Sequence, residues 1–152
     1  VGSYPIEAIS TMKKIILYTQ KNNAVKAIFN EPKKQQTISE AISATVISLG
    51  SIVGAVALVV ETKSGASARH VAAHRPKRTV LAVTSEPETA QQLSIVYGIK
   101  SFIRPIEKMA ATKLTNWLRR GGVLNAGDVI VTASGHYPGK VGGTDTIKVR
   151  VV

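Results

Sequence analysis

The sequence predicts an α/β fold: a three-layer α/β/α sandwich around a five-stranded mixed sheet whose last strand is antiparallel. Two observations support this prediction. Short apolar runs alternate with helical segments through the middle of the chain, which is typical of strand–helix–strand units, a parallel sheet and helices on both of its faces. The last two apolar runs are joined only by a glycine-rich stretch from Gly135 to Gly143, which is too short for a helical crossover.

The first 50 residues predict helices that precede the sheet. The first helix begins after Ser3 and ends at Asn22 and Asn23. Pro5 stands in its first turn, where the missing proline N–H leaves no hydrogen bond unmade. Apolar residues of this helix recur at helical spacing and are expected to face the core. They are Ala8, Ile9, Met12, Ile15 and Ile16.

A second helix is predicted to begin at a capping box. The side chains of Thr37 and Glu40, three residues apart, can each accept a hydrogen bond from a backbone N–H of the first turn. A short apolar piece at residues 25–29 and a polar loop at residues 31–36 precede this box, and Gly50 is expected to end the helix. The expected apolar face consists of Ile38, Ala41, Ile42, Val46 and Leu49.

Residues 51–152 are expected to form the sheet and the helices that cover it. The predicted strands are residues 55–60, 79–84, 99–103, 128–132 and 144–152. The helices between them are predicted at residues 67–74, from Ser85 onward behind a capping pattern with Pro87 in the first turn, and at residues 107–120. In the last strand, Ile147, Val149 and Val151 alternate with Lys148 and Arg150, which predicts an edge strand with one face in water.

The loop after the first predicted strand has the composition of a phosphate cradle. Thr62, Lys63, Ser64, Gly65 and Ser67 stand between a buried strand and the first turn of a helix. Their hydroxyls and backbone N–H groups can donate to an anion, and the helix N-terminus adds the positive end of its dipole. The same residue types also make ordinary turns, so composition alone leaves both interpretations open.

Composition restricts the location and the partners. The absence of cysteine excludes disulfides and thiolate metal sites and is compatible with a reducing cytosol, so we expect a cytoplasmic protein. The longest apolar stretch, near residues 52–60, is shorter than the roughly 20 residues that span a membrane, so no membrane partner is expected. The net charge of +11 favours an anionic partner. Because lysines and arginines occur singly or in pairs without a nucleic-acid-binding motif, a solvated basic surface is favoured over a nucleic-acid site.

Several short motifs occur in a fixed order along the chain. They are Gly2-Ser3-Tyr4-Pro5-Ile6-Glu7-Ala8, Thr62-Lys63-Ser64-Gly65, Ser67-Ala68-Arg69, Arg75-Pro76 followed by Val80-Leu81-Ala82-Val83-Thr84, Tyr97-Gly98-Ile99, Gly127-Asp128-Val129-Ile130-Val131, and Gly142-Gly143-Thr144-Asp145-Thr146-Ile147-Lys148-Val149. Together they resemble the C-terminal, effector-binding domain of pyruvate kinases. The resemblance covers essentially the whole chain, which is therefore expected to be one such domain over residues 1–152.

The resemblance implies a regulatory and assembly domain rather than an active site. The complete enzyme of the family transfers phosphate from phosphoenolpyruvate to ADP, giving pyruvate and ATP, with Mg²⁺ and often K⁺ bound on a (β/α)₈ barrel. That barrel would precede Val1, so no catalytic residue, metal ligand or cofactor is expected in this domain. The expected partners are the chain's own catalytic barrel and the other subunits of a homotetramer, held by contacts of this domain.

The same resemblance assigns site residues. Thr62, Lys63, Ser64, Gly65 and Ser67 fall on the family loop that binds an effector phosphate. Gly135, Gly139, Gly142 and Gly143 fall on the loop that covers the effector. Some relatives hold a second phosphate with a tryptophan and an arginine from a longer segment after the third strand. Residues 101–107 are short and have neither in that place, and Trp117 is expected in the core, so a sugar monophosphate, AMP or no effector is favoured over fructose 1,6-bisphosphate.

Other functions remain as alternatives. A stand-alone anion- or nucleotide-binding protein of the same fold would have the same loop. His70, His74 and His136 are candidate metal ligands, but surface or capping roles are favoured because no further ligand is identifiable. Ser67 with a histidine and Asp128 would make a hydrolytic triad, which is disfavoured because the sequence has no nucleophile elbow.

Overall fold

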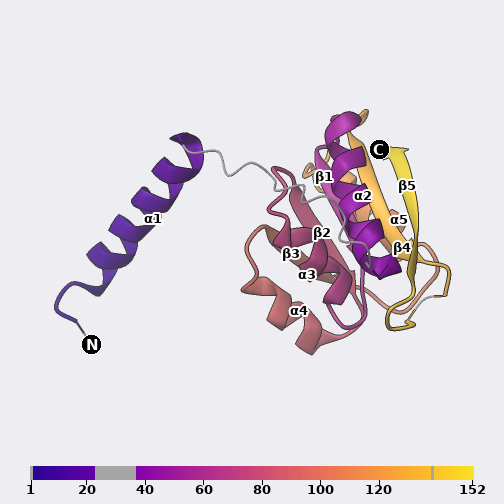
Figure 1. Cartoon of the computed structure of the whole chain (residues 1–152), viewed down its shortest axis with the longest axis horizontal. Helices are drawn as coiled ribbons and strands as arrows, with labels where there is room; N and C mark the ends of the chain where they lie inside the picture. The colour runs from indigo at the N-terminus through magenta and orange to yellow at the C-terminus, as the bar shows by residue number, and fades with distance from the viewer. Residues whose placement is uncertain (1, 23–36, 138) are drawn as a thin grey trace.

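The computed structural model describes residues 2–22, 37–137 and 139–152. Figure 1 shows the elements in chain order. They are α1 (Pro5–Asn22), α2 (Ile38–Ile52), β1 (Ala57–Glu61), α3 (Ala66–Ala73), β2 (Thr79–Thr84), α4 (Pro87–Ser94), β3 (Ile99–Ile103), α5 (Ala110–Arg120), β4 (Val129–Gly135) and β5 (Thr144–Val151). The predictions for residues 25–29 and 31–36 lie outside the described residues.

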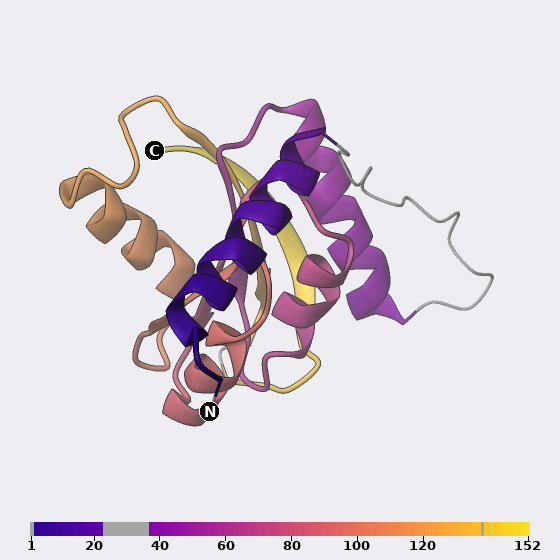
Figure 2. The same ribbon diagram turned by 90° about the vertical axis from the view of Figure 1, so that its left-hand side faces the viewer.

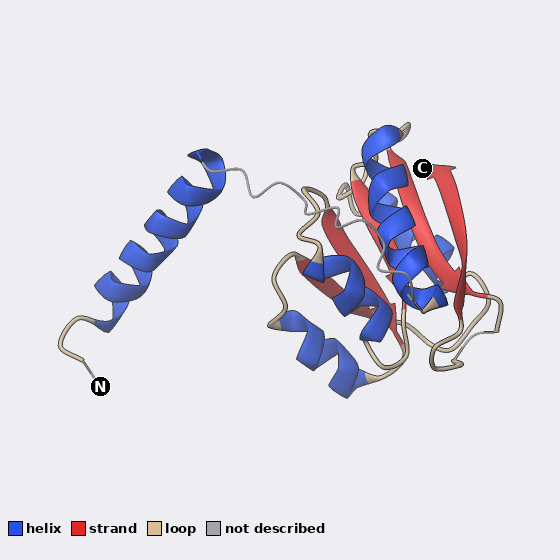
Figure 3. Ribbon diagram, viewed as in Figure 1, coloured by secondary structure: helices blue, strands red, loops and turns tan. Residues whose placement is uncertain are grey.

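The strands form one five-stranded sheet in the order β3-β2-β1-β4-β5. β1 pairs in parallel with β2 and β4, and β2 pairs in parallel with β3. β5 runs antiparallel to β4 and lies at the edge of the sheet (Figure 3). The predicted mixed sheet with an antiparallel last strand is therefore confirmed.

Helices cover both faces of the sheet, and each face has its own apolar core. Leu58 and Val60 of β1 pack with residues of α2, α3 and α4. Ala57 and Val59, on the opposite face of the same strand, pack with α5. This alternation gives the predicted three layers, because a strand buried on both faces presents successive side chains to opposite sides.

Most element boundaries agree with the sequence prediction to within a few residues. β2 and β3 have the predicted bounds. The capping box of Thr37 and Glu40 forms, although α2 continues two residues past Gly50. The capping pattern predicted for α4 is wrong, because the N-cap residue is Glu86 and its side chain makes no capping hydrogen bond. α5 begins three residues later than predicted, since Met109 adopts a left-handed backbone conformation with φ +62°.

α1 departs from the prediction in its packing. The helix forms, but none of its residues is buried, and Ile9, Met12 and Ile16 are more than half exposed. Figures 1 and 2 show α1 beside the sheet body and outside its layers, where Gln20 Nε2 donates a hydrogen bond of 2.7 Å to the hydroxyl of Tyr97. Helical periodicity identifies an apolar face but not what covers it, so the expectation that this face joins the core was wrong.

Two apolar features of the sheet body are also more exposed than expected. Trp117 was expected in the core, but it is 54% exposed on α5 and meets the ring of Phe102 edge to face. On β5, Ile147 packs on the core, whereas Val149 and Val151 remain exposed near the end of the edge strand. No helix in the described part of the chain is long and apolar enough to cross a bilayer.

Candidate functional site

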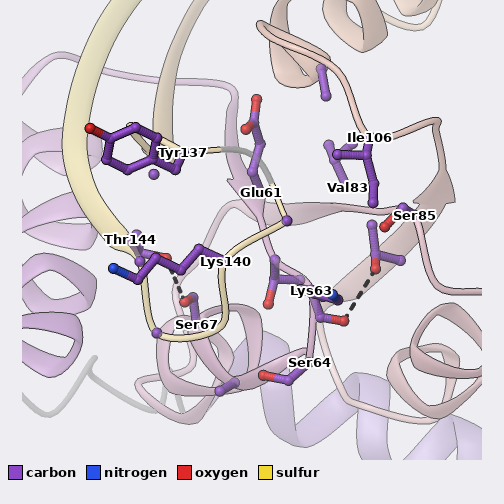
Figure 4. A pocket seen from close by; sticks show the side chains of 18 of the residues that line it. Glu61, Lys63, Ser64, Ser67, Val83, Ser85, Ile106, Tyr137, Lys140 and Thr144 are labelled. Carbon is purple, nitrogen blue, oxygen red and sulfur yellow. Dashed lines mark hydrogen bonds between the residues drawn. The ribbon is translucent and has the colours of Figure 1, made fainter.

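The candidate site lies at the point where the order of the strands reverses. From β1 the chain continues to β2 and β3 on one side, while β4 and β5 extend the sheet on the other side. The loops that leave the carboxyl ends of β1 and β4 therefore diverge, which creates the crevice where open α/β sheets commonly bind ligands. A pocket occupies this crevice and is lined by residues of both loops (Figure 4).

Gly65 shapes the loop between β1 and α3. It is the N-cap residue of α3 with φ +78°, a conformation that favours glycine. A Cβ at this position would lie 3.1 Å from Arg69 Nη1 and 3.3 Å from side-chain atoms of Thr89 and Leu93. Gly65 thus allows the backbone to turn into α3 directly beneath α4.

Side-chain hydrogen bonds hold the rest of this loop. The carbonyl oxygen of Lys63 accepts a hydrogen bond of 2.9 Å from Thr89 Oγ1, which ties the loop to α4. Ser67 Oγ and Thr144 Oγ1 share a buried hydrogen bond of 2.8 Å, which joins the first turn of α3 to the start of β5. The loop that carries Lys63 and Ser64 is therefore tied to α4 at Lys63 and to β5 at Ser67. Figure 4 shows the bond between Ser67 and Thr144.

The glycine-rich loop closes the opposite wall. A Cβ on Gly135 would lie 2.4 Å from the carbonyl oxygen of Gly143, so the two ends of the loop approach closer than any side chain would permit. Gly139 and Gly142 have φ values of +78° and +72°. A Cβ on Gly139 would lie 3.5 Å from Ile106, which places this part of the loop against the segment that follows β3.

The structure brings the two predicted sets of site residues to one pocket. Among the lining residues are Thr62, Lys63, Ser64 and Ser67 from the first loop and Gly135, Gly139, Gly142 and Gly143 from the second. Gly65 does not line the pocket. Its left-handed backbone sets the direction in which the chain enters α3. Lys140 and Tyr137 from the second loop also line the pocket. The arrangement combines backbone N–H groups, hydroxyls and ammonium groups, the donors that bind a phosphate.

Sequence reasoning missed Glu61, the last residue of β1, which also lines the pocket. Its Oε1 accepts a hydrogen bond of 2.7 Å from the backbone N–H of Ala111, in the first turn of α5. Burial raises the pKa of the Glu61 carboxyl, while the Ala111 hydrogen bond and the charge of Lys148 act in the opposite direction. The available signal was an acidic residue at the end of an apolar strand, but only the fold shows that its carboxylate meets the N-terminus of α5.

Sequence reasoning also missed Arg104 and Glu107. The expectation that residues 101–107 have no arginine in that place was wrong, because Arg104 belongs to this segment and lines the pocket. Arg104 Nη2 lies 3.6 Å from Glu107 Oε1, and Glu107 Oε2 pairs with Lys113 Nζ of α5. The pocket wall therefore carries both signs of charge.

The described residues form neither the hydrolytic triad nor the metal site that the sequence offered as alternatives. Ser67 Oγ is bonded to Thr144 and not to a histidine. Within residues 2–22, 37–137 and 139–152, no three His, Asp or Glu side chains come together as they would to hold a metal ion. The backbone N–H of His136 donates to Asp145, and His136 stacks edge to face on Tyr137.

Comparisons with known proteins agree on one family. A family model described as "Pyruvate kinase, alpha/beta domain" matches residues 40–150. Pyruvate kinase 2 of Synechocystis is 32% identical over 155 residues, which cover 100% of this chain and 26% of that protein. Pyruvate kinase of Geobacillus stearothermophilus is 31% identical over 156 residues, which cover 99% of this chain and 27% of that protein. The chain thus spans about a quarter of the length of the relatives it matches.

Solved structures share the fold. A crystal structure of a pyruvate kinase from Cryptosporidium parvum superposes with a TM-score of 0.83 at 21% identity, covering 99% of this chain and 30% of that one. A second structure of a Cryptosporidium parvum pyruvate kinase gives a TM-score of 0.80 at 20% identity. The order and direction of the strands are therefore those of a known architecture.

Proposed function

Because this chain belongs to the pyruvate kinase family as its C-terminal α/β domain, we propose that it is the regulatory and assembly part of an enzyme that transfers phosphate from phosphoenolpyruvate to ADP. In this proposal the domain performs no chemistry itself. It binds a phosphorylated effector, a sugar monophosphate or AMP, in the pocket between the two loops. The catalytic barrel is its partner within the same polypeptide.

One observation carries the effector proposal: the loop of Lys63 and Ser64 and the loop of Gly135 and Gly143 line the same pocket at the switch point of the sheet. Ser64 and Lys63 supply a hydroxyl and an ammonium group to a phosphate. Tyr137 and Lys140 from the covering loop also line this pocket and would contact the remainder of the ligand.

The Mg²⁺ and K⁺ of the family are assigned to the barrel and not to this domain. The described residues offer no group of three His, Asp or Glu side chains for a metal ion, so no step of the proposal passes through a metal bound here. In this proposal, the catalytic barrel performs the phosphoryl transfer itself.

Calorimetric titration of the full chain with AMP and with glucose 6-phosphate tests the effector proposal. We expect heat of binding at millimolar ligand or below, and a loss of at least tenfold in affinity in the double variant Lys63→Ala with Ser64→Ala, because two phosphate donors are removed. Lys77→Ala is the matched control, since Lys77 is exposed at the start of β2 and does not line the pocket. No heat from either ligand, or equal binding by the double variant, would refute the effector site.

For assembly, we propose that β5 contributes a contact between subunits of a homotetramer. β5 is an edge strand of the sheet, and its exposed side chains include Val149 and Val151. Such an edge offers unpaired backbone groups to a second strand across a two-fold axis. A cytoplasmic location is proposed on the same family grounds.

A further inference from the structure

Three charged residues meet at the end of the pocket that faces α5. Arg104 follows β3, Glu107 follows Arg104 by three residues, and Lys113 lies at the end of the first turn of α5. Arg104 Nη2 lies 3.6 Å from Glu107 Oε1, which is longer than a hydrogen bond, while Glu107 Oε2 contacts Lys113 Nζ directly. Glu107 is thus the shared counter-ion of two cations.

Arg104 is incompletely satisfied in this arrangement. Among the described residues, its buried Nε has no hydrogen-bond partner, and Glu107 is the one carboxylate with which it forms an ion pair. A buried donor without an acceptor is uncommon in folded proteins. A guanidinium group in a pocket wall with free donors has the geometry for binding a phosphate through two parallel hydrogen bonds.

Glu107 opposes the binding of a phosphate to Arg104. Its carboxylate lines the same pocket as Arg104, so a dianionic phosphate that approached this end would meet a like charge. The phosphate would also have to displace Glu107 from both of its cations before it could use them. At the other end, the described residues include no carboxylate that is hydrogen-bonded or ion-paired to the side chain of Lys63 or Ser64. Glu61 also lines the pocket, and its Oε1 accepts a hydrogen bond from the backbone N–H of Ala111.

We propose that Glu107 restricts the pocket to ligands with a single phosphate group, by serving as an internal anion that occupies Arg104 and Lys113. This inference rests on the proposed function and adds the residue that selects between ligands with one and with two phosphate groups. The phosphate binds at the Lys63 loop, and the end of the ligand near Glu107 carries uncharged hydroxyl groups, which can donate to the carboxylate. Removal of the Glu107 charge frees Arg104 to bind a second phosphate.

The test compares fructose 6-phosphate with fructose 1,6-bisphosphate, two ligands that differ by one phosphate group, in calorimetric titrations of the full chain. The wild type is expected to prefer the monophosphate. Glu107→Gln is expected to improve bisphosphate affinity about tenfold, the contribution of one hydrogen bond between charged groups, and to change monophosphate affinity less than twofold. Adding Arg104→Gln to Glu107→Gln is expected to abolish the gain.

Glu88→Gln is the matched control, because it removes the same charge from an exposed position on α4 that does not line the pocket. An equal bisphosphate gain in this variant would show an effect of net charge and overturn the proposal. If Glu107→Gln, folded as judged by its thermal melt, binds both sugars as the wild type does, Glu107 does not select the ligand, yet the effector site itself stands. If no variant and no wild-type sample binds either sugar, this inference is refuted, whereas the effector site is decided by the titrations with AMP and glucose 6-phosphate.

Discussion

Replacement of Gly135 by alanine tests whether the covering loop depends on the close approach of its two ends. A Cβ at Gly135 would lie 2.4 Å from the carbonyl oxygen and 3.0 Å from the carbonyl carbon of Gly143. Both are backbone atoms, so no side-chain rotation can relieve the clash. The strand end and the loop must separate, which in overpacked sites costs about 1–3 kcal/mol of unfolding free energy.

Urea denaturation of Gly135→Ala beside Gly121→Ala measures this cost. Gly121 ends α5 with φ −82°, and its added Cβ would lie 3.6 Å from the carbonyl oxygen of Trp117, an ordinary contact distance, so the control should remain within about 0.5 kcal/mol of the wild type. We expect a lower midpoint for Gly135→Ala with an unchanged slope, together with weaker binding of AMP, because the displaced loop opens the pocket. Equal midpoints for the two variants would refute the reasoning.

The remaining predictions concern Glu61 and β5. Burial raises the pKa of the Glu61 carboxyl, so protonation of Glu61 stabilises the folded state. This contribution to the free energy of unfolding is fully present below the ordinary pKa of 4.5 and is lost as the pH rises through the folded-state pKa. Glu61→Gln should therefore raise the melting temperature at pH 7 and lose this advantage in acid below pH 4.5, whereas a pH-independent difference would contradict the assigned cause. Val151→Glu should weaken subunit association in sedimentation velocity without lowering the melting temperature, since Val151 is 69% exposed, and unchanged sedimentation would exclude this end of β5 from the contact.

The elements of the sheet could be predicted because their signals are local. The apolar run of β2, the short apolar-rich stretch of β3 and the capping box of Thr37 require only neighbouring residues, and they occur where predicted. The start of α5 could not be placed, because Met109 is left-handed and residues other than glycine, asparagine and aspartate seldom adopt that conformation, so the sequence carries no signal for it. The exposure of Trp117 was also not predictable. α5 is an amphipathic helix, and the residue that Trp117 contacts, Phe102, belongs to β3.

The pocket shows the same limit. The loop of Lys63 and Ser64 has a composition that indicates anion binding, so it could be proposed from the sequence. Arg104 and Glu107 have no such signal, since each is an isolated charge in a short connection. Their relation to ligand binding becomes evident only when the fold places them in the wall of the same pocket. Glu61 likewise gains its altered pKa from burial beside α5, an element that lies far along the chain.

The exposed apolar face of α1 determines how fast its backbone amides exchange with deuterated solvent. A helix of 18 residues without tertiary packing is only marginally stable in water, and a single hydrogen bond from Gln20 adds little to hold it. The amides of α1 should therefore exchange long before those of β1 and β4 at the centre of the sheet. Any preparation in which the amides from Ile9 to Ile16 exchange slowly is one in which this face has been covered.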